Sequence, residues 1–202
     1  MLKLECQDTY LWDSFRDSDP DAFSRIYNLH VQALYQYGSK LTPDTGFVMD
    51  CIHDLFVDLS NHRSTIGTTD NIRFYLIRSL THRMIRAMKS HNKIRHDTID
   101  DYPFLLEAAF DDTLDEQETT RKKRHYLRDA LNELPYRQKE AIYLRYINNF
   151  NNEEIAQIMG INYQAVRNTL YKAIENLRKS ISKEDFILFL MVLRPHQTLP
   201  FF

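Results

Sequence analysis

Glycine, proline and cysteine are scarce in this sequence, and their scarcity narrows the choice of fold. The 202 residues include 4 glycines, 6 prolines and 2 cysteines. Few turn-forming residues and little strand-like alternation favour an all-α protein, and 43% hydrophobic residues are enough for one or two folded cores. Two distant cysteines, Cys6 and Cys51, cannot build a disulfide framework or a metal site, so we expect both to be buried thiols.

Long apolar runs and catalytic motifs are missing as well. The N-terminal residues MLKLECQDTY contain no apolar stretch of signal-peptide length, and no segment approaches the roughly 20 apolar residues of a membrane span. The scattered glycines form no phosphate-binding loop, and no Ser/His/Asp or Cys/His set suggests catalysis. We therefore expect a cytoplasmic protein that is not an enzyme and that uses no metal, no cofactor and no small-molecule substrate.

Charge of one sign is concentrated in blocks, although the net charge of the whole chain is only −2. Residues 73–96 contain 7 basic and no acidic residues, and residues 121–183 contain 13 basic and 6 acidic ones. Residues 97–120, between them, contain 9 acidic residues and no basic one. Basic blocks of this kind are typical of surfaces that bind phosphate groups.

The stretch 151–178, NNEEIAQIMGINYQAVRNTLYKAIENLR, predicts two short helices joined by a tight turn. Asn151 and Glu154 have the spacing of a capping box, and Gly160 allows the positive φ of a sharp turn. Asn162 is a candidate cap for the second helix. The apolar residues of the two helices recur at helical spacing, as expected for a helix-turn-helix: Ile155, Ile158, Met159, Val166, Leu170, Ala173 and Leu177.

The opposite face of the second helix carries residue types that recognise DNA. Gln and Asn can pair with an adenine edge, Arg with guanine, and Lys with phosphate. A solvated face on an ordinary helical hairpin has a similar composition, but the surrounding basic block favours DNA binding. We expect this helix to lie in a major groove and contact DNA through Tyr163, Gln164, Arg167, Asn168, Tyr171 and Lys172.

The first seventy residues also predict helices. One begins at Asp19 and Pro20, and a break at residues 41–44 precedes another at 45–59. In the second of these, Val48, Ile52, Leu55 and Leu59 share an inward face. Asp50, Asp54 and Asp58 share another, where like charges four residues apart repel by a few tenths of a kcal/mol unless a basic group meets them. A solvated face is the alternative, and His53 beside it is more typical of polar surface than of a metal site.

A polar loop at residues 60–71 leads into a basic helix predicted at 72–95. Its cations alternate with the aromatic residues Phe74 and Tyr75, as in proteins that stack single-stranded bases on rings. For each of these two rings alone, a place in the core beside extended arginine side chains is the favoured interpretation.

Taken in this order, the stretches resemble a sigma factor of bacterial RNA polymerase, of the small extracytoplasmic-function (ECF) group that keeps only sigma domains two and four. DCIHDLFVDL resembles the polymerase-binding helix, and NIRFYLIRSLTHRMIRAMK resembles the promoter-melting helix. LNELPYRQKEAIYLRY and the helix-turn-helix resemble domain four. The resemblance covers about residues 8–182, and the variant looks most like Bacteroidetes-like sigma factors that pair with membrane anti-sigma proteins. His53 departs from the usual Gln, and Thr81, His82 and Arg83 stand where Arg-Asn is common.

The resemblance implies domain two at residues 1–96, an acidic linker at 97–120, domain four at 121–183 and an apolar tail at 184–202. It implies that the protein binds core RNA polymerase, promoter DNA and an anti-sigma factor. The protein would also open the two strands of the promoter. The polymerase contacts would be Asp50, His53, Asp54 and Phe56, and the melting residues would be Arg73, Tyr75, Arg78, His82, Arg83 and Arg86. In the linker, Phe104, Leu105, Leu106 and Phe110 are expected to be docking anchors rather than core residues.

Two other classes of function remain open from the residues alone. One is a free-standing helix-turn-helix regulator whose helical N-terminal half binds a partner or senses a signal. The other is a protein-binding adaptor. For the tail FILFLMVL at residues 186–193, we expect packing on domain four or between the domains, with docking to an anti-sigma factor as the alternative.

Overall fold

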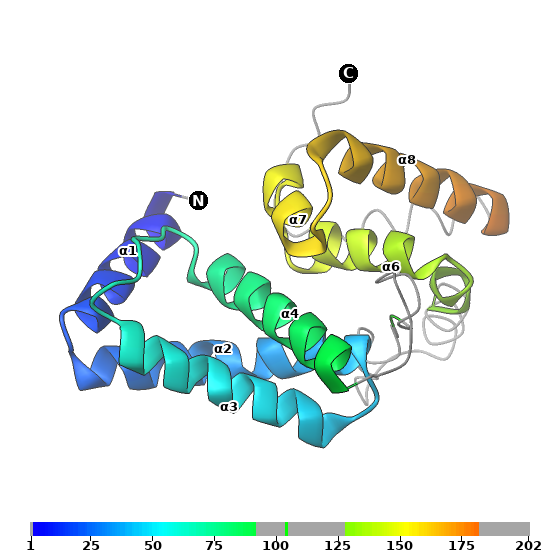
Figure 1. Ribbon diagram of the computed structural model, residues 1–202. Coiled ribbons are helices and arrows are strands. Elements are labelled where there is room, and N and C mark those ends of the chain that lie inside the picture. The colour runs from blue at the N-terminus through cyan, green and yellow to red at the C-terminus, as the bar shows by residue number, and fades with distance from the viewer. Residues whose placement is uncertain (1, 92–103, 105–127, 182–202) are drawn as a thin grey trace, which may run out of the picture. The chain divides into compact units, whose positions relative to one another are not determined.

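The computed structural model describes residues 2–91, 104 and 128–181, and the regular structure in these residues is entirely helical (Figure 1). The all-α prediction is therefore confirmed for this part of the chain. The chain divides into two compact units, residues 1–103 and 104–202. Among the described residues, no helix is both long and apolar enough to cross a membrane.

Over residues 2–91, the part of it that the structure describes, the N-terminal unit has four helices: α1 (Leu2–Arg16), α2 (Pro20–Leu41), α3 (Thr45–His62) and α4 (Ile72–His91). Helices α2 and α3 begin where aspartates cap them. The Asp19 carboxylate accepts a hydrogen bond from the backbone N–H of Asp21, and that of Asp44 accepts one from Phe47. Helix α3 continues to His62, three residues past the predicted end at Leu59, so the loop before α4 is shorter than expected.

Helices α2, α3 and α4 pack against one another, and α1 packs on α2 and α4 (Figure 1). The predicted inward residues Val48, Ile52, Leu55 and Leu59 are all buried. Gly38 allows α2 and α3 to approach closely, because a Cβ at this position would lie 2.7 Å from Val48 Cγ1. Cys51 is a buried free thiol, as expected; the side chain of Cys6 lies outside the described part.

The C-terminal unit contains α6 (Tyr136–Ile142), which continues through a π-helical turn (Tyr143–Ile147), and then α7 (Asn152–Met159) and α8 (Tyr163–Ser180). The predicted helix-turn-helix is confirmed in detail. Asn151 Oδ1 accepts from the Glu154 N–H at 2.9 Å, and Glu154 Oε2 accepts from the Asn151 N–H at 2.8 Å. Gly160 has a φ of 64°, and Asn162 caps α8. The predicted apolar residues are buried, except that Leu170 is half-buried.

Phe104 corrects the prediction that the aromatic residues of the linker avoid the core. Its side chain is buried, and its ring meets that of Tyr143 at 5.5 Å with an interplanar angle of 62°. Phe104 is therefore a core residue of the C-terminal unit. Leu105, Leu106, Phe110 and the apolar tail at 186–193 lie outside the described residues, so the expectations for them stay predictions.

Candidate nucleic-acid and polymerase interfaces

The predicted DNA-binding residues share the exposed face of α8. The burial of Val166, Ala173 and Leu177 against the unit turns this face outward, and Tyr171 is 72% exposed. Gln164 Nε2 donates a hydrogen bond to Asn168 Oδ1 at 3.2 Å, so one turn of the helix presents two linked amides. The remaining members of the set are also exposed: Tyr163, Arg167 and Lys172.

The predicted polymerase contacts on α3 are exposed, with one exception. Asp50, His53 and Asp54 point away from the core. Phe56 is only 4% exposed, and its ring packs against Tyr27 at 4.9 Å and Phe23 at 6.1 Å. The expectation of a direct contact through Phe56 is therefore corrected: this ring holds α3 on α2.

Arg83 links the aspartates of α3 to the basic helix α4. Its guanidinium lies 3.6 Å from Asp54 Oδ2 and forms an ion pair and hydrogen bond with Asp58. The basic group that the aspartates need is therefore supplied from within the chain, at least for two of the three. Arg83, predicted to melt the promoter, therefore lies beside Asp54, predicted to bind polymerase.

A hollow of about 750 Å³, here called the α3–α4 hollow, lies between α3, α4 and the loop that joins them. It brings together four of the six predicted melting residues: Tyr75, His82, Arg83 and Arg86. Its other lining residues are Leu55, Asp58, Leu59, His62, Ile66, Ser79 and Ala87. The lining thus combines an aromatic ring, two arginines, two histidines, one aspartate and several apolar side chains.

Arg73 and Arg78 do not belong to the α3–α4 hollow. Arg73 lines a separate hollow of about 600 Å³ with residues of α1 and α2, among them Asp8 and His30. Arg78 is exposed and lines neither hollow. The six predicted melting residues therefore occupy more than one surface of α4, and only four can act on one ligand in the hollow.

Tyr75 presents an uncharged ring to the hollow. Burial raises the pKa of its phenol, although a hydrogen bond with Ser79 and the charge of Arg78 act in the opposite direction. The ring also packs against that of Trp12 at 4.9 Å, so the expectation that Tyr75 belongs to the packed interior is correct in part. One face of the unit therefore offers a fixed aromatic surface beside cations, a combination suited to an unpaired base.

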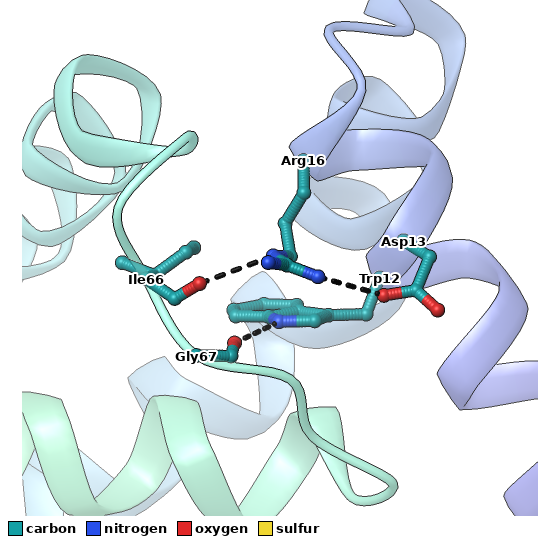
Figure 2. A network of polar contacts seen from close by, with 5 residues as sticks. All are labelled: Trp12, Asp13, Arg16, Ile66 and Gly67. Atoms are coloured by element: carbon teal, nitrogen blue, oxygen red, sulfur yellow. Dashed lines mark hydrogen bonds and ion pairs between the residues drawn. The ribbon is translucent and has the colours of Figure 1, made fainter.

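Helix α1 was not predicted from the sequence, nor were its two residues that hold the loop between α3 and α4, residues 63–71. Figure 2 shows Trp12 and Arg16 both directed at this loop. Trp12 Nε1 donates to the Gly67 carbonyl at 2.9 Å, and Arg16 Nε donates to that of Ile66 at 3.1 Å. The apolar residues Leu11, Trp12 and Phe15, spaced as on one helical face, were the available signal.

Comparison with known proteins shows the family of the chain. Residues 124–177 match the family model described as Sigma-70, region 4; this range includes α7 and most of α8. RNA polymerase sigma factor SigV of Bacillus subtilis is 28% identical over 160 residues, which are 77% of this chain and 89% of SigV. The ECF RNA polymerase sigma factor SigX of the same organism is 20% identical over 161 residues, 79% of this chain and 83% of SigX. The chain is an RNA polymerase sigma factor of the ECF type.

A solved structure has a similar fold. It is the sigma factor RpoE in complex with the anti-sigma factor NepR from Bartonella quintana, with a TM-score of 0.52 and 17% identity, covering 78% of this chain and 94% of that one. As a sigma factor, the protein directs transcription initiation, acts with core RNA polymerase on promoter DNA and is not an enzyme. The relatives span both halves of the chain, which argues against a free-standing regulator with an unrelated N-terminal half. They do not support a Bacteroidetes-like lineage.

Proposed function

We propose that this sigma factor divides its work among three surfaces. The aspartates of α3 meet a basic surface of core polymerase, the α3–α4 hollow receives an unpaired base of the opened promoter, and α8 lies in the major groove of the upstream promoter element. The observation that carries the proposal is the α3–α4 hollow, because it gathers Tyr75, His82, Arg83 and Arg86 around one space beside the aspartate face.

Strand opening in this scheme is driven by binding. Each base-pair step costs roughly 1.4 kcal/mol to open, and a base stacked on an aromatic side chain recovers roughly 1–3 kcal/mol. The volume of the hollow, about 750 Å³, is within the range of roughly 300–1,000 Å³ that is usual for small-molecule sites. The neutral phenol ring of Tyr75 would stack on the base, while the cations would lie near the strand's phosphates.

Promoter recognition is assigned to α8. Its exposed amides and guanidinium are suited to base edges, and Lys172 is suited to a phosphate. Arg167→Ala is expected to cost roughly 1–3 kcal/mol at one or two base pairs, whereas Lys172→Ala should weaken binding to all sequences and lower its salt dependence. Lys179→Ala removes the same charge further along the helix and serves as the control. Identical effects of the first two variants across a promoter library would contradict this assignment.

The polymerase surface is assigned to Asp50, His53 and Asp54, with Phe56 supporting α3 from below. Reversing one charge changes the interaction by two unit charges, or about 2 kcal/mol at about 4 Å in water, so Asp50→Lys should weaken binding to core polymerase by about thirtyfold. Asp17→Lys makes the same exchange at an exposed position just after α1 and should leave the affinity unchanged. Equal affinities of the two variants would refute the assignment.

Control by a protein partner completes the proposal. The relative RpoE is solved with an anti-sigma factor, and we infer that an anti-sigma factor restrains this protein as well, in the cytoplasm, where its polymerase works. Co-purification from cells that lack the inducing signal would identify the partner. Recovery of core polymerase alone, under every growth condition tested, would argue against such restraint.

A further inference from the structure

The loop between α3 and α4, residues 63–71, is fixed by a helix that lies about fifty residues earlier in the sequence. The carbonyls of Ile66 and Gly67, which are consecutive, each accept a hydrogen bond from a different side chain of α1 (Figure 2). Arg16 is itself oriented by Asp13, which accepts from its NH1 at 3.1 Å. Two neighbouring peptide groups of the loop are therefore held in defined orientations.

The same helix also packs against a second part of the lining of the α3–α4 hollow. The indole of Trp12 is fully buried and packs against the ring of Tyr75 at 4.9 Å with an interplanar angle of 58°. At the beginning of α4, the Asp8 carboxylate accepts a hydrogen bond from the backbone N–H of Ile72 at 3.1 Å. Because Ile66 and Tyr75 both line the hollow, α1 contacts two parts of its lining, one in the loop and one on α4.

A hollow for a flat base depends on the spacing between these two parts of the lining. The loop has no regular structure of its own at residues 66–70, so its backbone position depends on groups outside it. An indole can only donate, and the Nε of Arg16 is aimed at the loop while its NH1 is held by Asp13. The two side-chain donors from α1 add to the backbone hydrogen bond from the Ile66 N–H to the His62 carbonyl at 3.1 Å, and they fix the directions of the Ile66 and Gly67 carbonyls.

We propose that Trp12 and Arg16 are positioning residues, which hold Ile66 and Tyr75 at the separation that admits an unpaired base of the displaced promoter strand. The inference rests on the function proposed for the α3–α4 hollow. Neither side chain needs to contact the DNA. Their effect should therefore appear as a loss of discrimination for a base in the hollow, without loss of the DNA contacts made by α8.

The test uses full-length protein bound to core polymerase and a set of forked promoter DNAs. An abasic site is placed at each non-template position of the opened segment in turn, and the affinity ratio of intact to abasic DNA is measured. Trp12→Phe keeps an aromatic ring and removes the N–H donor. Arg16→Met keeps the apolar stem and removes the guanidinium. Arg25→Met, an exposed position on α2, is the control.

For the unaltered protein we expect one position at which the abasic site weakens binding by about tenfold, as expected for one stacked base. In Trp12→Phe and Arg16→Met this ratio should fall to about two or less, because binding to the intact fork weakens while binding to the abasic fork stays unchanged. A merely structural role would reduce the active fraction for every DNA alike and leave the ratio unchanged. The proposal is overturned if both variants keep the original ratio.

Failure of the underlying function gives a different result. If the unaltered protein has no position sensitive to an abasic site, the α3–α4 hollow does not receive a base, and the proposed function falls together with this inference. If sensitivity is present and survives in both variants, only the positioning role is refuted. Arg16 is half-buried, so Arg16→Met remains informative even if the fully buried Trp12 does not tolerate substitution.

Discussion

Replacement of Arg83 by Met should change two affinities of this sigma factor in opposite directions. The guanidinium offsets the negative charge of Asp54 and Asp58 on α3 and also lines the α3–α4 hollow. Its removal makes the proposed polymerase surface more negative and the proposed strand site less positive. We therefore expect tighter binding to core polymerase and weaker binding to the opened strand.

The expected magnitudes follow from exposure and distance. The side chains of Arg83, Asp54 and Asp58 are 29%, 64% and 54% exposed, so their pairing stabilises the fold by only about 0.2–1 kcal/mol. The variant should therefore remain folded. One unit charge at about 8 Å in water contributes about 0.5 kcal/mol, or a twofold change in the dissociation constant for polymerase. At about 4 Å from a phosphate the loss is about 1 kcal/mol, or fivefold.

Both affinities can be measured with one labelled protein, first with core polymerase and then as the assembled holoenzyme with forked DNA. Arg86→Met is the matched control, because Arg86 lines the same hollow and no aspartate of α3 is shown paired with it. It should weaken strand binding without tightening polymerase binding. Both effects should shrink at high salt, where screening is strong. If Arg83→Met weakens both interactions, or leaves polymerase affinity unchanged, Arg83 does not balance the aspartates.

Three further predictions concern stability. Burial lowers the pKa of His30; the charge of Asp8 opposes this shift and that of Arg73 adds to it, both to a smaller extent. The unfolded chain therefore binds the proton more readily, and the free energy of unfolding should fall as pH drops below about 6.5. Chemical denaturation should show a weaker pH dependence for His30→Gln. Gly38→Ala should destabilise the N-terminal unit by about 1–2 kcal/mol, because overpacking costs about 1–3 kcal/mol and the gain in helix propensity is below about 1 kcal/mol. In thermal melts the control is Gly67→Ala, whose added Cβ would meet no atom within 4 Å. Asn151→Ala should cost about 1 kcal/mol through loss of the α7 cap, and an unchanged melting temperature would contradict that role.

The helix-turn-helix could be predicted almost completely from the sequence, because its signals act over a few residues. Asn151 and Glu154 satisfy each other's backbone groups within one turn, and Gly160 adopts the positive φ that only glycine takes without strain. The exposed face of α8 follows from the periodicity of its buried residues. None of these features depends on where the rest of the chain lies, so the sequence by itself determined them.

The features that only the tertiary structure decided all join distant parts of the chain. Phe56 was expected on the surface of α3, but its burial depends on the rings that α2 brings against it. The pairing of Arg83 with Asp58 spans 25 residues, and the bond from Trp12 to Gly67 spans 55. Periodicity shows which residues share a face of one helix. It does not show which face another helix covers, because that depends on the packing of the whole unit.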